Sequence, residues 1–220
     1  MKSLNNWLLV LSVLSCFGCS SPVHEDDRGC AFVSDSIQYR VEFMSAGCVR
    51  ILSFPEGDTL VTKRLVVDSE KPAFKDYKWE DTGQKLLFRT RELSVVFDKA
   101  DAAFIFQETS TGKLLLKEKG DRKARNFKRS VAGGEQCLEV TQCFVPTEDE
   151  AIYGLGQYQN GIMNYRGKSV LLLQANMDIV NPFLISTNGY GVLWDNYSST
   201  KFEDTKEGYS FTSEVGDASD

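Results

Sequence analysis

Short runs in which apolar and polar residues alternate dominate the chain. The clearest is 37–43 (IQYRVEF), where every second residue is apolar, and this period of two is typical of a half-buried β-strand. Further apolar runs of strand length follow at 48–54, 85–97, 102–107, 114–117, 136–145, 169–174, 182–186, 191–194 and 209–213. Turn signals separate them, such as Gly112 within 108–113 (ETSTGK) and the hairpin pair Asn188-Gly189.

No window carries the apolar i, i+3, i+4, i+7 stripe of an amphipathic helix. A parallel doubly wound sheet is excluded, because parallel strands need long crossover connections that are usually helical. With about ten short strands separated by turns, we predict an all-β chain that forms one antiparallel sandwich or barrel. The segment 61–83 is richer in charge and poorer in pattern, so we expect it to be a long excursion between strands.

The N-terminal residues 1–19 (MKSLNNWLLVLSVLSCFGC) have the pattern of an export signal. Lys2 supplies the positive charge, and the apolar stretch that follows is too short to span a bilayer. Its end resembles a bacterial lipobox in two competing registers, which make Cys16 or Cys19 the lipidated residue. The alternative is a plain secretory signal with incidental cysteines. We expect an exported lipoprotein that faces the periplasm or the outer membrane and reaches a membrane only through its lipid anchor, with residues 20–29 as a flexible tail.

Export implies an oxidising compartment, which makes the remaining cysteines of interest. If Cys19 is the anchor, then Cys30, Cys48, Cys137 and Cys143 remain. Cys137 and Cys143 fall on one predicted strand, where they would be about 20 Å apart and beyond disulfide reach. Pairing with Cys30 or Cys48 and free buried thiols both stay open. No CxxC spacing occurs, so no metal cluster is expected.

Composition and charge exclude several classes of function. The 220 residues are 42% hydrophobic and 11% aromatic, which is enough apolar surface to build a core. The net charge is −6, from 25 Lys+Arg against 31 Asp+Glu, so nucleic acid is a poor partner. The one basic cluster, 117–128 (KEKGDRKARNFK), is interrupted by acidic residues and is read as a solvated loop in preference to a phosphate site. His24 is the single histidine and lies in the tail, which excludes a Ser-His-Asp triad and a histidine zinc site; no metal or cofactor is expected.

Two segments differ in composition from a plain β scaffold. Residues 151–167 (AIYGLGQYQNGIMNYRG) combine four glycines, three tyrosines and four amides. The simpler interpretation, which we prefer for this segment by itself, is a glycine-rich crossover between strands in which the tyrosines pack. Residues 172–197 place a polar stretch, 174–178 (QANMD), before Pro182 and end in Trp194-Asp195-Asn196-Tyr197. Aromatic, carboxylate and amide side chains together are the groups that bind sugars. The simpler alternative is that Asp195 and Asn196 cap local turns.

Several of these motifs, in this order, resemble the N-terminal domain of glycoside hydrolase family 31, of the α-xylosidase and α-glucosidase type. They are YGLGQYQNG, LLLQANMDIVNPFLIS, GYGVLWDNYS and SEVGDASD, and the resemblance is weak from about Cys30 and strong from Tyr153 onward. It implies a galactose-mutarotase-like antiparallel β-sandwich over residues 30–220, which packs against a (β/α)8 catalytic barrel. Family members are retaining enzymes that carry an aspartate nucleophile and an aspartate acid/base on that barrel.

The resemblance also suggests a role for the polar stretch at 174–178. In this family the sandwich lends one loop to the rim of the active-site pocket, and by position that loop matches Gln174, Asn176 and Asp178. The sequence ends at Asp220, where a full-length member would enter its barrel. We therefore expect no catalytic residue within these 220 residues, and the missing barrel becomes a packing partner.

Two functional hypotheses follow from the resemblance. In the first, the chain is the N-terminal carbohydrate-binding or scaffold part of a retaining α-glycosidase that acts on α-linked xylosyl or glucosyl oligosaccharides and is inactive by itself. In the second, it is a stand-alone carbohydrate-binding surface lipoprotein. A mutarotase activity is disfavoured, because no histidine lies inside the sandwich.

Overall fold

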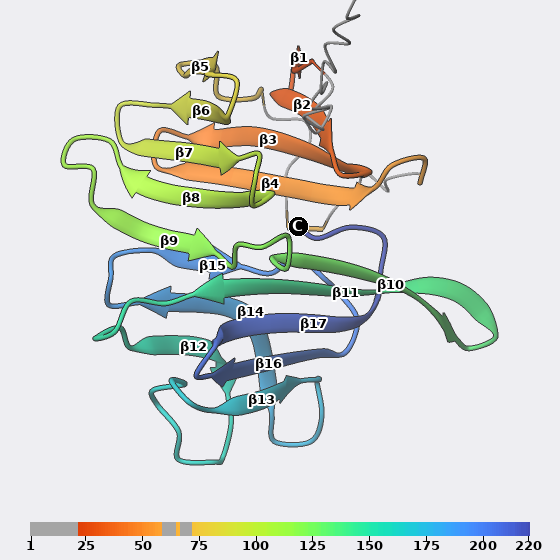
Figure 1. Ribbon diagram of the computed structural model, residues 1–220. Coiled ribbons are helices and arrows are strands. Elements are labelled where there is room, and N and C mark those ends of the chain that lie inside the picture. The colour runs from red at the N-terminus through yellow and green to blue at the C-terminus, as the bar shows by residue number, and fades with distance from the viewer. Residues whose placement is uncertain (1–21, 59–64, 67–71) are drawn as a thin grey trace, which may run out of the picture.

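The computed structural model describes residues 22–58, 65–66 and 72–220. All regular secondary structure in that part of the chain consists of β-strands (Figure 1). The strands form three antiparallel sheets, so the predicted all-β class is confirmed. The predicted export signal, residues 1–19 with Cys16 and Cys19, lies outside the described residues. Within the part of the chain that the structure describes, no helix is long and apolar enough to cross a membrane.

Two small sheets form one layer of the molecule. The four-stranded sheet, in the upper half of Figure 1, has the order β1-β2-β3-β4, with β1 at His24–Glu25, β2 at Cys30–Ser34, β3 at Ile37–Ser45 and β4 at Cys48–Pro55. The three-stranded sheet, in the lower half, has the order β12-β14-β15, with β12 at Ile152–Gln157, β14 at Ile179–Ser186 and β15 at Gly191–Leu193.

The other layer is a ten-stranded sheet in the order β13-β16-β17-β11-β9-β8-β7-β6-β5, with β10 paired to β11 off this path. Its strands are β5 (Lys78–Asp81), β6 (Lys85–Arg89), β7 (Leu93–Asp98), β8 (Ala103–Glu108), β9 (Leu114–Glu118), β10 (Arg125–Ala132), β11 (Glu135–Val145), β13 (Ser169–Leu172), β16 (Thr200–Thr205) and β17 (Gly208–Gly216). The long hairpin of β10 and β11 extends away from the body (Figure 1).

The sandwich contains two hydrophobic cores, one under each small sheet. The core under the four-stranded sheet is aromatic, and Phe32 packs on Phe97 with ring centroids 4.8 Å apart. In the core under the three-stranded sheet, Phe202 packs on Phe211 at 5.3 Å. Phe106 of β8 packs against both cores. Apolar side chains at alternate strand positions explain these cores, because alternate residues point to one face of a sheet.

The structure corrects the sequence-based boundaries in several places. The run at 85–97 is divided by a turn in which the Thr90 hydroxyl accepts the N–H of Leu93 at 2.9 Å. The excursion at 61–83 contains β5, and the segment expected as a tail contains β1. Most importantly, the basic cluster at 117–128 is not one solvated loop, since its ends belong to β9 and β10. Strand β16 was not predicted, because three of its six residues, Lys201, Glu203 and Asp204, are charged.

Candidate functional site

The three predicted rim residues lie together on the connection between β13 and β14. Gln174 closes this connection, because its Nε2 donates to the carbonyl of Asp178 at 2.8 Å and its Oε1 accepts the N–H of Val180 at 3.2 Å. The Asp178 N–H donates to the Ala175 carbonyl at 3.3 Å, which makes a tight turn. The turn leaves the side chain of Asn176 exposed and that of Asp178 half-buried. Gln174 therefore holds the loop, while Asn176 and Asp178 are accessible to a ligand.

Strand β12 supports this loop through two glycines. Gly156 has φ +116°, and a Cβ built there would lie 2.1 Å from the carbonyl oxygen of Ile179, the first residue of β14. Gly154 has φ +104°, and a Cβ built there would lie 2.5 Å from the carbonyl oxygen of Phe183. Only glycine permits such a close approach of two backbones at positive φ. The two glycines of YGLGQ are thus explained by strand pairing.

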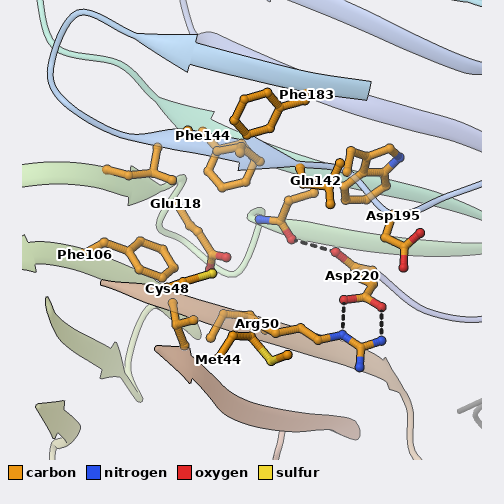
Figure 2. A pocket seen from close by; sticks show the side chains of 18 of the residues that line it. Met44, Cys48, Arg50, Phe106, Glu118, Gln142, Phe144, Phe183, Asp195 and Asp220 are labelled. Carbon is orange, nitrogen blue, oxygen red and sulfur yellow. Dashed lines mark hydrogen bonds and ion pairs between the residues drawn. The ribbon is translucent and has the colours of Figure 1, made fainter. Parts of the chain in front are cut away.

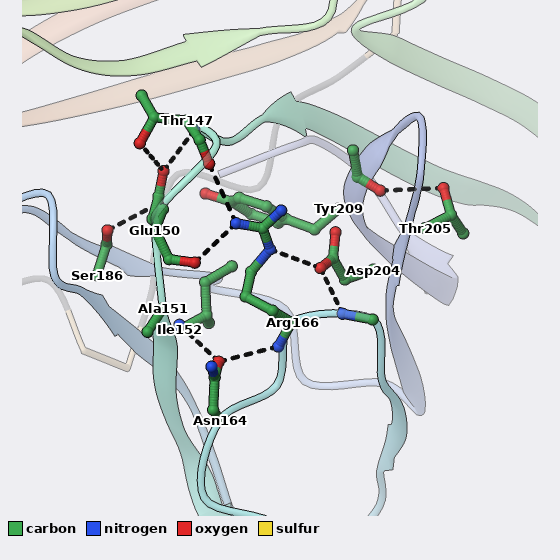
Figure 3. Close-up of polar contacts among 12 residues, drawn as sticks. Thr147, Glu150, Ala151, Ile152, Asn164, Arg166, Ser186, Asp204, Thr205 and Tyr209 are labelled. Atoms are coloured by element: carbon green, nitrogen blue, oxygen red, sulfur yellow. Dashed lines mark hydrogen bonds and ion pairs between the residues drawn. The ribbon is translucent and has the colours of Figure 1, made fainter.

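A buried polar network holds the connection between β12 and β13, residues 158–168, against the sandwich (Figure 3). The Arg166 guanidinium donates to Asp204 Oδ2 at 2.8 Å and to the carbonyls of Thr147 and Glu150 at 3.2 and 2.7 Å. The N–H of Gly167 also donates to Asp204 Oδ2, at 2.7 Å. Only 2% of the Asp204 side chain is exposed, and a polar group buried to this extent needs such hydrogen bonds.

The carboxylate of Glu150 is the other centre of this network. Its Oε1 accepts the hydroxyls of Ser186 and Tyr190, and its Oε2 accepts the N–H of Thr147 at 2.8 Å. Burial and the bond to Glu150 raise the pKa of Tyr190 above its ordinary value. All of these donors belong to the fold itself, so the network is structural and fixes the connections on either side of the rim loop.

The tyrosines of 151–167 divide between packing and exposure. Tyr165 is buried and meets Phe202 edge to face at 6.2 Å. The Tyr158 hydroxyl donates to the Leu155 carbonyl at 3.0 Å, and burial raises its pKa to about 12. Tyr153 lies on the outer face of β12 and is partly exposed. The glycine-rich segment is therefore mainly scaffold, as the simpler interpretation held.

Within the segment 194–197, the aromatic ring of Trp194 is buried and that of Tyr197 is exposed. Trp194 is 2% exposed, stacks on Phe211 at 5.5 Å and donates its indole N–H to Ser213 Oγ at 2.8 Å. The Asn196 side chain accepts the N–H of Ser198 at 2.8 Å, which confirms its reading as a turn cap. The ring of Trp194 is therefore not available to a sugar, because it packs on Phe211 of the large sheet.

A groove with a volume of about 320 Å³ lies between the two small sheets (Figure 2). Its walls are the edges of β4 and β15, and its floor comes from β8, β9 and β11. It is lined largely by apolar side chains, among them Met44, Ile51, Phe106, Leu116, Phe144 and Phe183. No pattern in the sequence predicts this groove, because its two walls are about 140 positions apart and are brought together by the large sheet.

A buried ion pair lies in the floor of the groove. Arg125 and Glu118 have side chains 4% and 3% exposed and contact one another. Glu118 also accepts the N–H of Phe104 at 2.7 Å, and burial raises its pKa. The Arg125 guanidinium lies 5.2 Å from the ring centroids of Tyr39 and Phe104. Two residues of the basic cluster are thus core residues.

The cysteines of the described residues form no disulfide. Cys30, Cys48, Cys137 and Cys143 are all free thiols, and the last two lie on β11 as expected. Among residues 22–58, 65–66 and 72–220, no group of three or more His, Cys, Asp or Glu side chains is placed to hold a metal ion.

Comparison with known proteins gives a consistent family assignment. The model of the glycosyl hydrolase 31 N-terminal galactose mutarotase-like domain matches residues 38–203. The α-xylosidase of Saccharolobus solfataricus is 34% identical over 178 residues, which cover 74% of this chain and 23% of that protein. An uncharacterised family 31 glucosidase of Pseudescherichia vulneris is 36% identical over 91 residues, 41% of this chain and 17% of its own length.

Solved structures agree. The family 31 α-xylosidase of Xanthomonas citri superimposes with a TM-score of 0.73 at 31% identity, over 84% of this chain and 20% of that one. A family 31 α-xylosidase from a soil metagenome, complexed with xylose, gives a TM-score of 0.75 at 22% identity, over 90% of this chain and 31% of its own; at that identity the likeness shows the fold alone. The chain spans about a fifth to a third of the length of these relatives, apart from the shorter glucosidase match.

Proposed function

Because the chain belongs to the family of glycosyl hydrolase 31 N-terminal galactose mutarotase-like domains, we propose that it serves a retaining α-glycosidase as the domain that holds one wall of the sugar pocket. The catalytic aspartates are then carried by a barrel, and the substrate is an α-linked xylosyl or glucosyl oligosaccharide. The names of the most similar relatives, two of them α-xylosidases above 30% identity, support this substrate class. Attachment through Cys16 or Cys19 to a membrane facing the periplasm belongs to the same proposal.

One observation carries the proposal: the loop 174–178 is built to present side chains outward. Gln174 satisfies both ends of its amide on the loop backbone, so the loop keeps its shape without a ligand. Asn176 and Asp178 are left with their polar groups accessible, and an amide and a carboxylate are suited to a pair of sugar hydroxyls. A loop ordered in advance binds with a smaller entropy cost.

The outer face of the three-stranded sheet is the proposed packing surface for the barrel. Phe183 and Ile185 of β14 point away from the core and pair across strands with Leu193 and Tyr153. Each of these four side chains is 36–52% exposed. Contiguous apolar surface of this kind marks a protein interface. The relatives, several times longer than this chain, have the additional polypeptide to cover it.

The first test is kinetic and uses the intact protein with its barrel. Replacing Asn176 or Asp178 by Ala should lower kcat/KM for an aryl α-xyloside or α-glucoside about tenfold or more, since a lost hydrogen bond to substrate costs about 1–3 kcal/mol. Asn126→Ala is the matched control, because Asn126 is an exposed amide on β10. Unchanged kinetics in both loop variants would remove the loop from the pocket.

The reading frame beyond codon 220 provides the second test. It should continue into a (β/α)8 barrel with two aspartates, or a barrel should be encoded beside it. Absence of both would favour the stand-alone binding lipoprotein, which should then retain xylo- or gluco-oligosaccharides on its own.

A further inference from the structure

The two walls of the groove in Figure 2 are the free edges of two sheets. β4 is the last strand of the four-stranded sheet, and β15 is the last strand of the three-stranded sheet. The groove is lined by 48–51 on one side and by 191–195 on the other. A free edge presents N–H and C=O groups that another strand can pair with. The groove therefore has hydrogen-bonding capacity along both walls.

The end of the sequence already enters this groove. The N–H of Ser53 donates to the Ser219 carbonyl at 2.9 Å, and the N–H of Ser219 donates back to Ser53 at 2.8 Å. This exchange is the hydrogen-bonded pair of an antiparallel ladder, and the bridge is antiparallel. On the other wall, the N–H of Asp195 donates to the Asp220 carbonyl at 3.1 Å. Residues 219–220 thus lie between β4 and the end of β15.

At residues 219–220 the chain runs along the groove. Because the pairing with β4 is antiparallel, a residue after Asp220 lies opposite a β4 residue before Leu52. By the alternation of an antiparallel ladder, the N–H and C=O groups of Ile51 and Val49 face the groove, as those of Ser53 do. Asp220 fits this register, since its carboxylate accepts from Arg50 Nε at 2.8 Å on the outer face.

Unpartnered polar atoms in the groove are consistent with a polypeptide there. Asp195 is 6% exposed and its Oδ2 has no partner among the described residues. Two atoms of Arg125, Nε and Nη1, are also buried and have no hydrogen-bond partner among the described residues. Both residues line the groove. A peptide backbone supplies N–H donors and C=O acceptors, the groups that these atoms lack.

We propose that the groove holds one further β-strand, namely the segment that directly follows Asp220 in the intact protein. This strand pairs with β4 on one side and with β15 on the other, and it joins the two small sheets into one continuous layer over the ten-stranded sheet. The inference rests on the proposed function only in requiring that such a segment exists.

The register fixes which side chains of this strand face the core. Residues directly opposite one another in a ladder point to the same face. Val49 and Ile51 pack on the core under the four-stranded sheet. The first and third residues after Asp220 therefore point inward, toward Phe106 and Phe144, and should be apolar. The second and fourth residues point outward with Arg50 and Cys48.

A disulfide bond to a native cysteine tests this register. Cys48 is five residues before Ser53, so its partner is five residues after Ser219, the fourth residue after Asp220. In the intact protein, a cysteine introduced there should form a disulfide with Cys48 under mild oxidation, because non-hydrogen-bonded pairs have Cα atoms about 4.5 Å apart. A cysteine at the third residue after Asp220, which points inward, is the matched control and should give at least tenfold less cross-link. Cys48→Ser should abolish the product, which peptide mapping identifies.

Hydrogen exchange on the unmodified intact protein supplies a measurement that needs no variant. The amides of Ile51 and Val49 should exchange as slowly as that of Ser53. Equal cross-linking at the third and fourth positions, no cross-link at either, or fast exchange at both amides would overturn the inference. A stop codon directly after codon 220 would also overturn it.

These outcomes are separable from those of the proposed function. Hydrolysis of an aryl α-xyloside by a protein that shows no cross-link and no protection would refute the strand and keep the enzyme. A specific cross-link without hydrolysis of either glycoside would support the strand and refute the proposed enzyme function. With a stop codon, the proposed function still stands if a separately encoded barrel restores hydrolysis.

Discussion

At the residue scale, the charged side chains inside the sandwich depend on specific partners. Glu118 and Arg125 are both almost fully buried and bond to one another, and Glu118 also accepts a backbone N–H. The sequence placed both residues in a solvated loop, because a run rich in Lys, Arg, Glu and Asp is usually exposed. What it could not show is that the strands β9 and β10 turn these two side chains inward.

Removing one charge of this pair should be costly. Glu118→Gln leaves the Arg125 guanidinium buried without a counter-charge, which we expect to lower the free energy of unfolding by about 3–5 kcal/mol. Glu139→Gln is the control, since Glu139 makes only a long contact with an exposed lysine and should change stability by less than about 1 kcal/mol. Urea denaturation of both variants measures the difference. Equal midpoints would show that the buried pair contributes little.

At the scale of elements, the rim loop takes its position from β12 and β14. The apolar run at 182–186 predicts the second half of β14, but the sequence pattern predicts no strand within the glycine-rich segment 151–167. The strand within it, β12, carries glycines at two positions where a side chain would collide with β14. Such close pairing depends on the partner strand, so the sequence alone could indicate only that glycine was needed there.

Gly156→Ala should therefore detach β12 from β14 beside the loop. The added Cβ would overlap the Ile179 carbonyl, and alanine is strained at φ +116°; we expect a loss of at least about 2 kcal/mol. Gly133→Ala is the matched control, because its φ is also positive but nothing lies within 4 Å, so the loss should be about 1 kcal/mol. Thermal denaturation compares the two. Faster hydrogen exchange at Val180 in the first variant alone would locate the effect at the loop.

At the scale of the whole molecule, the apolar outer face of the three-stranded sheet is the feature that most affects behaviour in solution. Tyr153, Phe183, Ile185 and Leu193 form it, from three strands that no short sequence window contains. Its exposure is consistent with a domain whose neighbour covers this face. The same face should be adhesive when that neighbour is absent.

The 220-residue chain by itself is accordingly expected to self-associate. Ile185→Lys should shift it toward monomer in size-exclusion chromatography with light scattering and should reduce the binding of a hydrophobic dye. Val131→Lys, at an exposed position on the β10 hairpin, should leave both readouts unchanged. A monomeric parent chain that binds no dye would contradict the expectation.

The sequence by itself determined the class of this fold and, through its motifs, the family. Side chains alternate between the two faces of a strand, and this alternation depends only on the local backbone. Strands such as β3 and β11 could therefore be predicted without knowledge of their neighbours. The resemblance likewise brought Gln174, Asn176 and Asp178 together, because they are neighbours in the chain. Strand pairing between distant parts of the chain decided three other features. These are the buried Glu118–Arg125 ion pair, the Arg166–Asp204 ion pair and the groove between β4 and β15. These features depend on which strands meet, and that is settled by the burial of all apolar faces at once, which no single segment encodes.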